Sequence, residues 1–207
     1  MQNKICVFDF DGVLGNSRDV GYAMHNNINK KYSLPKITNR EEYLNVIDNG
    51  HLKEKIDSDS ITNYYLECND YYSKRLKNIT LFPAIKELLK SSPKDIIIIS
   101  SSPDSFIKEI LKQEGIEDVT IYGKETAKSK KERFEMLLKD RDINKEDIIY
   151  IGDTIDDYKF CNQVGISMIG SNYGYSNLEE IKDYLLLLVH SSEELVEVVK
   201  QYMLVRW

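Results

Sequence analysis

The chain has 207 residues, of which 42% are hydrophobic and 30% are charged, and its formal net charge is −6 at pH 7. This composition is typical of a globular protein with a full hydrophobic core. The acidic balance disfavours nucleic acid and anionic membranes as partners, and no apolar run is long enough to cross a bilayer. The three cysteines form no closely spaced pair, and we see no signal peptide, so we expect a cytoplasmic protein.

The first strand-like segment, Ile5 to Phe8, is a short apolar run rich in β-forming residues. Such a run is typical of a strand that is buried on both faces. Asp9 and Asp11 follow at once, and residues two apart on an extended chain point to the same side. Carboxylates at the end of a buried strand are costly unless a cation, a hydrogen-bond donor or a substrate meets them. An ordinary Asp-Gly turn is the alternative interpretation.

Between residues 17 and 78 the sequence contains no strand-like run. Polar and proline-containing breaks divide this segment, and we expect several amphipathic helices. His25 and His51 have no partner at the spacing of metal ligands, so we do not expect them to bind a metal. The segment is entered and left close to the first strand, which indicates an inserted helical domain. The tyrosines expected to pack within it are Tyr64, Tyr65, Tyr71 and Tyr72.

Strands and helices alternate along the rest of the chain. The apolar runs that predict strands are Ile96–Ile99, Val119–Tyr122, Ile148–Ile151, Ile166–Ile169 and Leu185–Val189. This alternation predicts a Rossmann-like α/β fold, a parallel sheet covered by helices on both faces. We therefore expect a core formed by residues 1–16 and 79–207 and an inserted helical cap domain formed by residues 17–78.

Polar residues follow three of the predicted strands. They are Asp9 and Asp11 after the first strand, Ser100 after the isoleucine run, and Asp153 and Asp157 after the run that ends at residue 151. Ligand sites of parallel α/β sheets lie at the carboxyl ends of the strands, so we expect these groups to meet at one edge. A lysine at the start of a later helix would add a positive charge there.

These motifs resemble those of the haloacid dehalogenase-like hydrolases, in particular the phosphatase branch with an inserted helical cap. The matching segments are D-F-D-G-V-L with Asp9 and Asp11, I-I-I-I-S with Ser100, a lysine in K-S-K-K-E-R-F, and G-D-T-I-D-D with Asp153 and Asp157. The resemblance implies a phosphoglycolate phosphatase-like enzyme that acts on a small phosphorylated metabolite. Dehalogenases of the family lack an acid at the position of Asp11, so its presence favours phosphoryl transfer.

The residue types suit this chemistry. Asp9 is the predicted nucleophile, because a carboxylate can form an aspartyl-phosphate that water then hydrolyses. Asp11 is the predicted general acid and base, which protonates the leaving oxygen and later deprotonates the attacking water. Ser100 and Ser101, together with nearby backbone N–H groups, are predicted to bind the phosphoryl oxygens.

A hard cation is expected between the anionic nucleophile and the anionic substrate. Carboxylate, water and phosphate oxygens suit Mg²⁺. The resemblance implies that Asp9, the backbone carbonyl of Asp11, and Asp153 bind it. Asp157 is either a further, water-mediated ligand or the partner of the lysine.

Two positions are candidates for that lysine. Lys130 is favoured because it lies four residues before Phe134 and seven before Leu137, which places it at a helix start with those residues facing the core. Lys128 is the alternative, with a longer lead into the helix. The other lysines nearby are interpreted as solvated charges.

Two other functions fit the same motifs. A sugar-phosphate mutase uses the same aspartyl-phosphate without releasing phosphate, and a non-catalytic binding protein can retain the fold. The sequence predicts neither the individual substrate nor the oligomeric state. Asn16 and the turn at residues 48–51 are candidates for substrate contacts, and ordinary hinge and turn roles suit them equally well.

Overall fold

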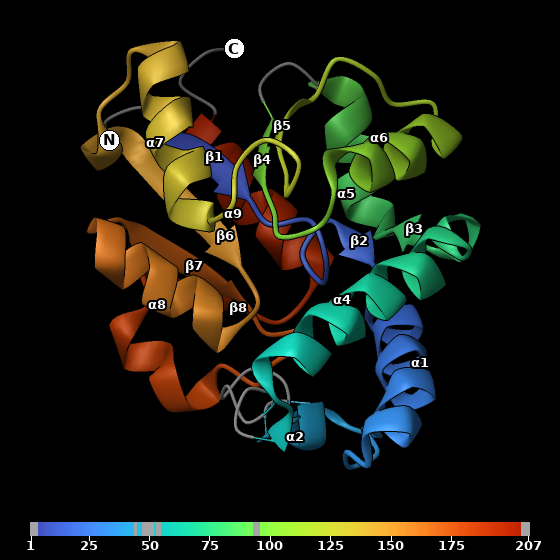
Figure 1. The fold of residues 1–207 in the computed structure, drawn as a ribbon. Helices are drawn as coiled ribbons and strands as arrows, with labels where there is room; N and C mark the ends of the chain where they lie inside the picture. The colour runs from blue at the N-terminus through green and yellow to red at the C-terminus, as the bar shows by residue number, and fades with distance from the viewer. Residues whose placement is uncertain (1–3, 44, 47–51, 53–54, 93–95, 204–207) are drawn as a thin grey trace.

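The computed structural model describes residues 4–43, 45–46, 52, 55–92 and 96–203 (Figure 1). Within this part of the chain, parallel strands form a six-stranded sheet in the order β5-β4-β1-β6-β7-β8. In that order the strands are Thr120–Tyr122, Ile97–Ile99, Ile5–Phe8, Ile148–Gly152, Ser167–Ser171 and Leu187–Val189. β1 pairs with β4 on one side and with β6 on the other. The segments that follow these three strands therefore leave the sheet side by side at one edge.

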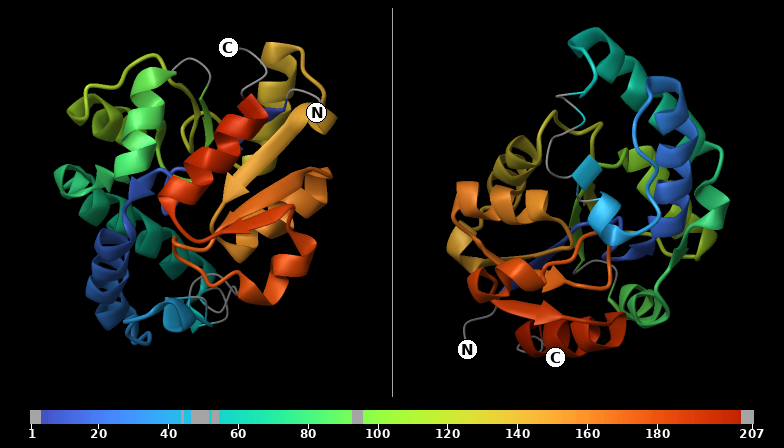
Figure 2. Two further views of the ribbon diagram at one scale, coloured as in Figure 1. Left: turned by 180° about the vertical axis from the view of Figure 1, so that it is seen from behind. Right: turned by 90° about the horizontal axis from the view of Figure 1, so that it is seen from below.

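Helices cover both faces of the sheet. One face carries α5 (Pro83–Ser91), α6 (Asp104–Gln113) and α9 (Ser192–Met203), and the other carries α7 (Lys130–Arg141) and α8 (Ile155–Val164). Figure 1 shows α7 and α8 in front of the sheet, and the reverse view in Figure 2 shows α9 across the opposite face. Neighbouring residues of β1 pack on opposite faces of the sheet. Phe8 belongs to the apolar cluster with α5, α6 and α9, and Val7 belongs to the cluster with α7 and α8. The predicted Rossmann-like α/β fold is confirmed.

The strand ends differ slightly from those predicted. β4 begins at Ile97 instead of Ile96, and β8 begins at Leu187 instead of Leu185. In the second case the 3-10 helix Glu179–Tyr184 ends directly before the predicted run, and Leu185 and Leu186 form a bend between that helix and β8. A further 3-10 helix, Lys145–Asp147, leads into β6.

Between β1 and α5 the chain leaves the sheet and forms a separate layer of helices. It contains α1 (Arg18–Asn29), the 3-10 turn Lys30–Tyr32, α2 (Arg40–Tyr43), α4 (Ser58–Ser73) and the 3-10 turn Leu76–Asn78. We call these elements the helical layer; Figure 1 shows them in blue and teal below the sheet. α1 and α4 pack against each other around a third apolar cluster that includes Ile28 and Tyr64, both almost fully buried. None of the helices that the structure describes is long and apolar enough to cross a membrane.

A short antiparallel ribbon lies where the chain enters and leaves the helical layer. It consists of β2 (Gly15–Asn16) and β3 (Thr80–Leu81), with Gly15 opposite Leu81. The sequence analysis did not predict these strands, because two residues are too few to show an alternating pattern. The ribbon joins the two ends of the helical layer directly beside β1.

Candidate active site

A cavity of about 620 Å³ lies between the carboxyl edge of the sheet and the helical layer. On the sheet side it is lined by Asp9, Ser100, Lys130 and Asp153, which come from four separate segments of the chain. On the other side it is lined by residues of α1, α2 and α4. The strand order thus brings together motifs that lie up to 144 positions apart, between Asp9 and Asp153.

Asp9 directly follows β1 and is almost fully buried. Its N–H donates a 2.8 Å hydrogen bond to the carbonyl oxygen of Ile151, which extends the pairing of β1 with β6. Its Oδ1 accepts a 2.7 Å bond from the N–H of Phe10, and its Oδ2 accepts a 2.7 Å bond from Lys130. Burial raises the pKa of Asp9 above its ordinary range, and Lys130 opposes that rise.

Lys130 is the first residue of α7, and its N-cap, Ser129, accepts a hydrogen bond from the N–H of Glu132. This start places the ammonium group between two carboxylates, 2.7 Å from Asp9 Oδ2 and in direct contact with Asp157 Oδ1. Burial alone lowers the pKa of Lys130, but the two carboxylates outweigh burial and raise the pKa above its ordinary range. Lys130 is therefore held in its charged form.

The alternative candidate, Lys128, lies differently. Its side chain is exposed and borders the cavity. The structure brings Lys130, and not Lys128, into contact with Asp9.

Asp157 has hydrogen-bond partners on both carboxylate oxygens. Oδ2 accepts bonds from the N–H of Asp153 at 3.2 Å and from the N–H and hydroxyl of Thr154 at 3.1 and 2.7 Å, which forms the capping box of α8. Oδ1 accepts bonds from Lys130 and, at 3.3 Å, from the hydroxyl of Tyr150. The carboxylate of Asp157 thus fixes both the start of α8 and the position of the lysine.

Three buried carboxylates lie close together at this edge. Oxygen atoms of Asp9, Asp153 and Asp157 are all within 4.8 Å of one another. Two glycines allow Asp153 to sit here, because a Cβ at Gly12, whose φ is +77°, would lie 2.1 Å from Asp153 Oδ2, and one at Gly174 would lie 2.2 Å from it. A single ammonium group cannot balance three buried negative charges, and an all-oxygen donor set suits a hard divalent cation.

Asp11 is held by two hydroxyl groups. Tyr72 of α4 donates to its Oδ1, and Ser102, in the loop after β4, donates to its Oδ2 at 2.5 Å. The sequence analysis assigned Tyr72 to packing and did not single out Ser102. Tyr72 does pack in the apolar core, but its hydroxyl also connects the helical layer to the first motif.

The predicted phosphate-binding serines follow β4. Ser100 is buried and accepts a 3.2 Å bond from the N–H of Ser102, while Ser101 is exposed and borders the cavity. The sequence analysis missed Arg133 of α7, whose buried guanidinium donates to the carbonyl oxygens of Ser100 at 2.9 Å and of Ala127 at 2.9 and 3.1 Å. Arg133 therefore fixes the loop after β4 relative to α7.

A loop after β7, residues 172–176, also reaches the site and was not predicted. The N–H of Tyr175 donates a 2.6 Å bond to Asp153 Oδ2, and its hydroxyl lies 3.1 Å from that of Ser17. Arg40 of α2 donates to the carbonyl oxygens of Gly174, at 3.1 and 3.2 Å, and of Asn172. The loop thus connects a buried carboxylate to the helical layer.

Of the two candidate substrate contacts, only Asn16 falls within the described residues. Asn16 is exposed in β2 and does not line the cavity. The turn at residues 48–51, with His51, lies outside the described residues.

A family model described as haloacid dehalogenase-like hydrolase matches residues 6–171. This match spans more than half of the chain and includes the site residues from Asp9 to Asp157, while the loop at residues 172–176 lies beyond it. The chain belongs to the haloacid dehalogenase-like hydrolase family. The resemblance seen in the sequence motifs is confirmed.

Similar curated proteins carry the name phosphoglycolate phosphatase. One from Vibrio vulnificus (strain YJ016) is 25% identical over 122 residues, which cover 55% of this chain and 54% of the relative. Another, from Vibrio parahaemolyticus, is 26% identical over 144 residues, 63% of this chain and 62% of the relative. The match spans only about half to two thirds of the length of these relatives.

Solved structures share the whole fold at low identity. A haloacid dehalogenase-like family hydrolase from Streptococcus pneumoniae superposes with a TM-score of 0.78 at 20% identity, covering 96% of this chain and all of the other. A hydrolase from Pseudomonas syringae has a TM-score of 0.79 at 16% identity, covering 97% and 99% of the two chains. At these identities the likeness concerns the fold alone.

Proposed function

We propose that this protein is a Mg²⁺-dependent phosphatase that hydrolyses a small phosphorylated metabolite through an aspartyl-phosphate on Asp9. One observation carries the proposal: Lys130 lies between the buried carboxylates of Asp9 and Asp157, and Asp153 and Asp11 lie beside them. Membership of a hydrolase family and the names of the Vibrio relatives support it.

Asp9 is the nucleophile in this proposal. It is fixed by backbone hydrogen bonds at the end of β1, so its carboxylate is oriented toward the cavity before substrate binds. Lys130 keeps a positive charge beside it, which favours the ionised carboxylate and attracts the substrate phosphate. Attack by Asp9 forms the bond to phosphorus as the bond to the leaving oxygen breaks.

Asp11 is the general acid and base. In the first step it gives a proton to the leaving oxygen, and in the second it removes a proton from the water that attacks the aspartyl-phosphate. Tyr72 and Ser102 hold the carboxylate in place. The hydroxyl of Ser100 and the backbone around Ser101 are proposed to bind the phosphoryl oxygens.

Asp9, the backbone carbonyl of Asp11, and Asp153 are proposed to hold Mg²⁺. The ion supplies charge neutralisation between nucleophile and phosphate. Of the two roles considered for Asp157, we propose that of partner to Lys130, because both of its oxygens already accept hydrogen bonds from the protein.

The helical layer is proposed to act as a cap, the domain expected over residues 17–78, on a core of residues 1–16 and 79–207. It covers the cavity opposite the reacting groups, and the ribbon of β2 and β3 joins it to the core beside β1. A cover of this kind excludes water and contacts the leaving group. We also propose that the protein acts in the cytoplasm.

The test is phosphate release from a panel of small phosphate esters, with Mg²⁺ and with excess chelator. The wild type is compared with Asp9→Asn and with Asp19→Asn, an exposed matched control. We expect metal-dependent release in the wild type and in Asp19→Asn and its loss in Asp9→Asn. Release that persists in Asp9→Asn would rule out the proposed nucleophile, and isomerisation of a sugar phosphate without release would indicate a mutase.

A further inference from the structure

The cavity extends well beyond the reacting carboxylates to a wall formed by the helical layer. That wall includes Met24, His25, Tyr43, Tyr65, Cys68 and Asn69. Along it, no residue of the helical layer that the structure describes has a side chain that is charged at neutral pH. A leaving group bound to Asp11 would lie between the phosphate site and this wall.

Burial favours the neutral form of two titratable groups on the wall, His25 and Cys68. His25 is buried, and burial lowers its pKa to about 4. Its Nδ1 lies 2.8 Å from the hydroxyl of Tyr64, which itself donates to Asn29, so Nδ1–H is the donor to Tyr64. Burial raises the pKa of the Cys68 thiol to about 12.

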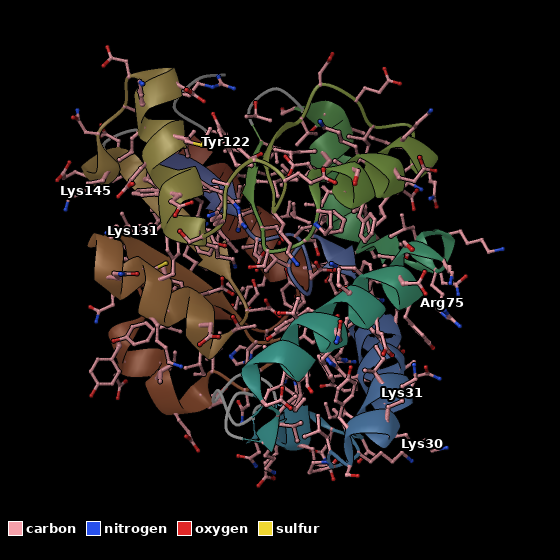
Figure 3. The ribbon with its side chains drawn as sticks, viewed as in Figure 1. Lys30, Lys31, Arg75, Tyr122, Lys131 and Lys145 are labelled. Carbon is pink, nitrogen blue, oxygen red and sulfur yellow. The ribbon has the colours of Figure 1, made fainter. Side chains whose placement is uncertain are left out.

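The cations of the helical layer are directed elsewhere. Figure 3 shows Lys30, Lys31 and Arg75 on the outer surface of that layer. Lys31 pairs with Glu67 at 2.5 Å, and the Arg75 guanidinium lies 3.5 Å above the ring of Tyr71. Arg40, as described above, donates to backbone carbonyls of the loop after β7. None of these cations lines the cavity.

Aromatic rings border the same space. Tyr43, Tyr65 and Tyr72 come from the helical layer, and Phe106 comes from α6 on the core side. The rings of Tyr72 and Phe106 are nearly parallel, with centroids 6.1 Å apart. Flat apolar surfaces of this kind suit a ring of the ligand. The volume also falls in the range of cavities that hold ligands much larger than a two-carbon acid.

The side chain of Asn69 offers a polar group to a ligand on this wall. The side-chain amide of Asn69 lines the cavity and takes part in none of the hydrogen bonds recorded among the described residues. It offers both a donor and an acceptor, which suits a hydroxyl or amide edge. Lys124 and Lys128 also line the cavity, exposed on the core-side loop before α7, with the acidic Asp156 also at the rim.

Resting on the function proposed above, we propose that the leaving group of the substrate is an uncharged alcohol that carries a ring and that Asn69 contacts its polar edge. A carboxylate on the leaving group would be desolvated against this wall, where the described residues of the helical layer offer no cation; the cations that line the cavity among the described residues lie on the core side. The proposed substrate therefore differs from phosphoglycolate, the compound in the name of the Vibrio relatives, because the leaving group of phosphoglycolate carries a carboxylate.

Four esters in two matched pairs test the charge and the ring separately. The pairs are hydroxyethyl phosphate with phosphoglycolate, and benzyl phosphate with para-carboxybenzyl phosphate. We expect the carboxylate to lower kcat/KM by about tenfold or more in each pair, and benzyl phosphate to exceed hydroxyethyl phosphate. Equal or better turnover of the carboxylate esters would overturn the proposal.

Calorimetry measures the affinity of the four esters for Asp9→Asn in the presence of Mg²⁺, where no turnover occurs. We expect the affinities to follow the same order as kcat/KM. If the wild type hydrolyses none of the four esters, the proposed function fails. The order of their affinities still shows whether the site prefers an uncharged leaving group with a ring. Asn69→Arg adds a cation to the wall and should reduce the penalty of the carboxylate by about tenfold. Asn63→Arg, on an exposed position of the same helix, should leave the ratio unchanged. A carboxylate penalty that Asn69→Arg does not alter would overturn the placement of the leaving group at this wall.

Discussion

Tyr72 donates a hydrogen bond from the helical layer to Asp11, the residue two positions after the proposed nucleophile. Ser102 holds the other oxygen of the same carboxylate. The orientation of Asp11 therefore depends on how the helical layer sits on the core. Asp11, the proposed general acid and base, has both of these hydrogen bonds only when the helical layer contacts the core.

Tyr72→Phe removes this hydrogen bond and keeps the ring that packs beside Phe106. A hydrogen bond to a charged group contributes about 1.5 kcal/mol or more, so we expect kcat to fall about tenfold with little change in KM. Steady-state kinetics measure this, with Tyr71→Phe on the same helix as the matched control. An unchanged kcat in Tyr72→Phe would show that the hydroxyl does not orient the catalytic group.

The variant Lys130→Met tests which of the two candidates, Lys130 or Lys128, is the site lysine. Loss of the ammonium group beside Asp9 and Asp157 should lower kcat/KM by about 10²- to 10³-fold. It should also lower the free energy of unfolding by about 3 kcal/mol in the absence of metal, because two buried carboxylates lose their cation.

The comparison uses two further variants. Lys131→Met is the matched control, since Lys131 is exposed on the same helix and labelled in Figure 3. Lys128→Met tests the rival assignment. A larger loss of kcat/KM in Lys128→Met than in Lys130→Met would reverse the assignment of the site lysine.

Asp153→Asn and Asp157→Asn should separate metal binding from helix capping. We expect Mg²⁺ to raise the melting temperature of the wild type, since a ligand that binds the folded state stabilises it. Asp153→Asn should abolish that rise. Asp157→Asn should destabilise the metal-free protein by about 1 to 2 kcal/mol through the capping box and keep part of the Mg²⁺ response. An unaltered Mg²⁺ response in Asp153→Asn, read by differential scanning calorimetry, would place the metal elsewhere.

His25 makes stability depend on pH. Its pKa falls from 6.5 to about 4 on folding because the ring is buried. As pH falls from 6.5 toward 4, the unfolded chain binds a proton that the folded chain does not, so the free energy of unfolding decreases by up to about 3 kcal/mol. Above pH 6.5 both states are neutral at this position, and it contributes no pH dependence.

Urea unfolding of the wild type and of His25→Gln at pH 7 and at about pH 5 isolates this effect. Carboxylates that titrate in the same range are common to both proteins and cancel in the difference. We expect the wild type to lose more stability than the variant between the two pH values. Equal losses would mean that His25 is accessible to protons in the folded state.

Much of the core could be predicted because its signals are local. The isoleucine run of β4 and the apolar run of β6 are buried on both faces, so their sequences are hydrophobic and rich in isoleucine. The ribbon of β2 and β3 could not be predicted, because its two-residue strands exist only through the pairing of Gly15 with Leu81, 66 positions later, and of Asn16 with Thr80.

Site residues that directly follow a strand could be predicted from the sequence. Those that reach the site through tertiary contacts could not. Asp9 and Asp153 directly follow hydrophobic strands, and Lys130 is the first residue of a helix with an apolar face, so these local patterns indicated their positions, with Lys128 left as the alternative lysine. The roles of Tyr72 and Arg40 depend on the placement of the helical layer over the core. No pattern within a helix contains that information.

The central claim is that Asp9 carries the phosphoryl group during turnover. Rapid acid quenching of the reacting protein, followed by intact mass analysis and reductive mapping of the acyl-phosphate, tests it most directly. We predict that the wild type gains the mass of one phosphoryl group on Asp9 and that Asp9→Asn gains none. Phosphate release without a phosphorylated Asp9 at any quench time, or a phosphoryl group on another residue, would contradict the mechanism.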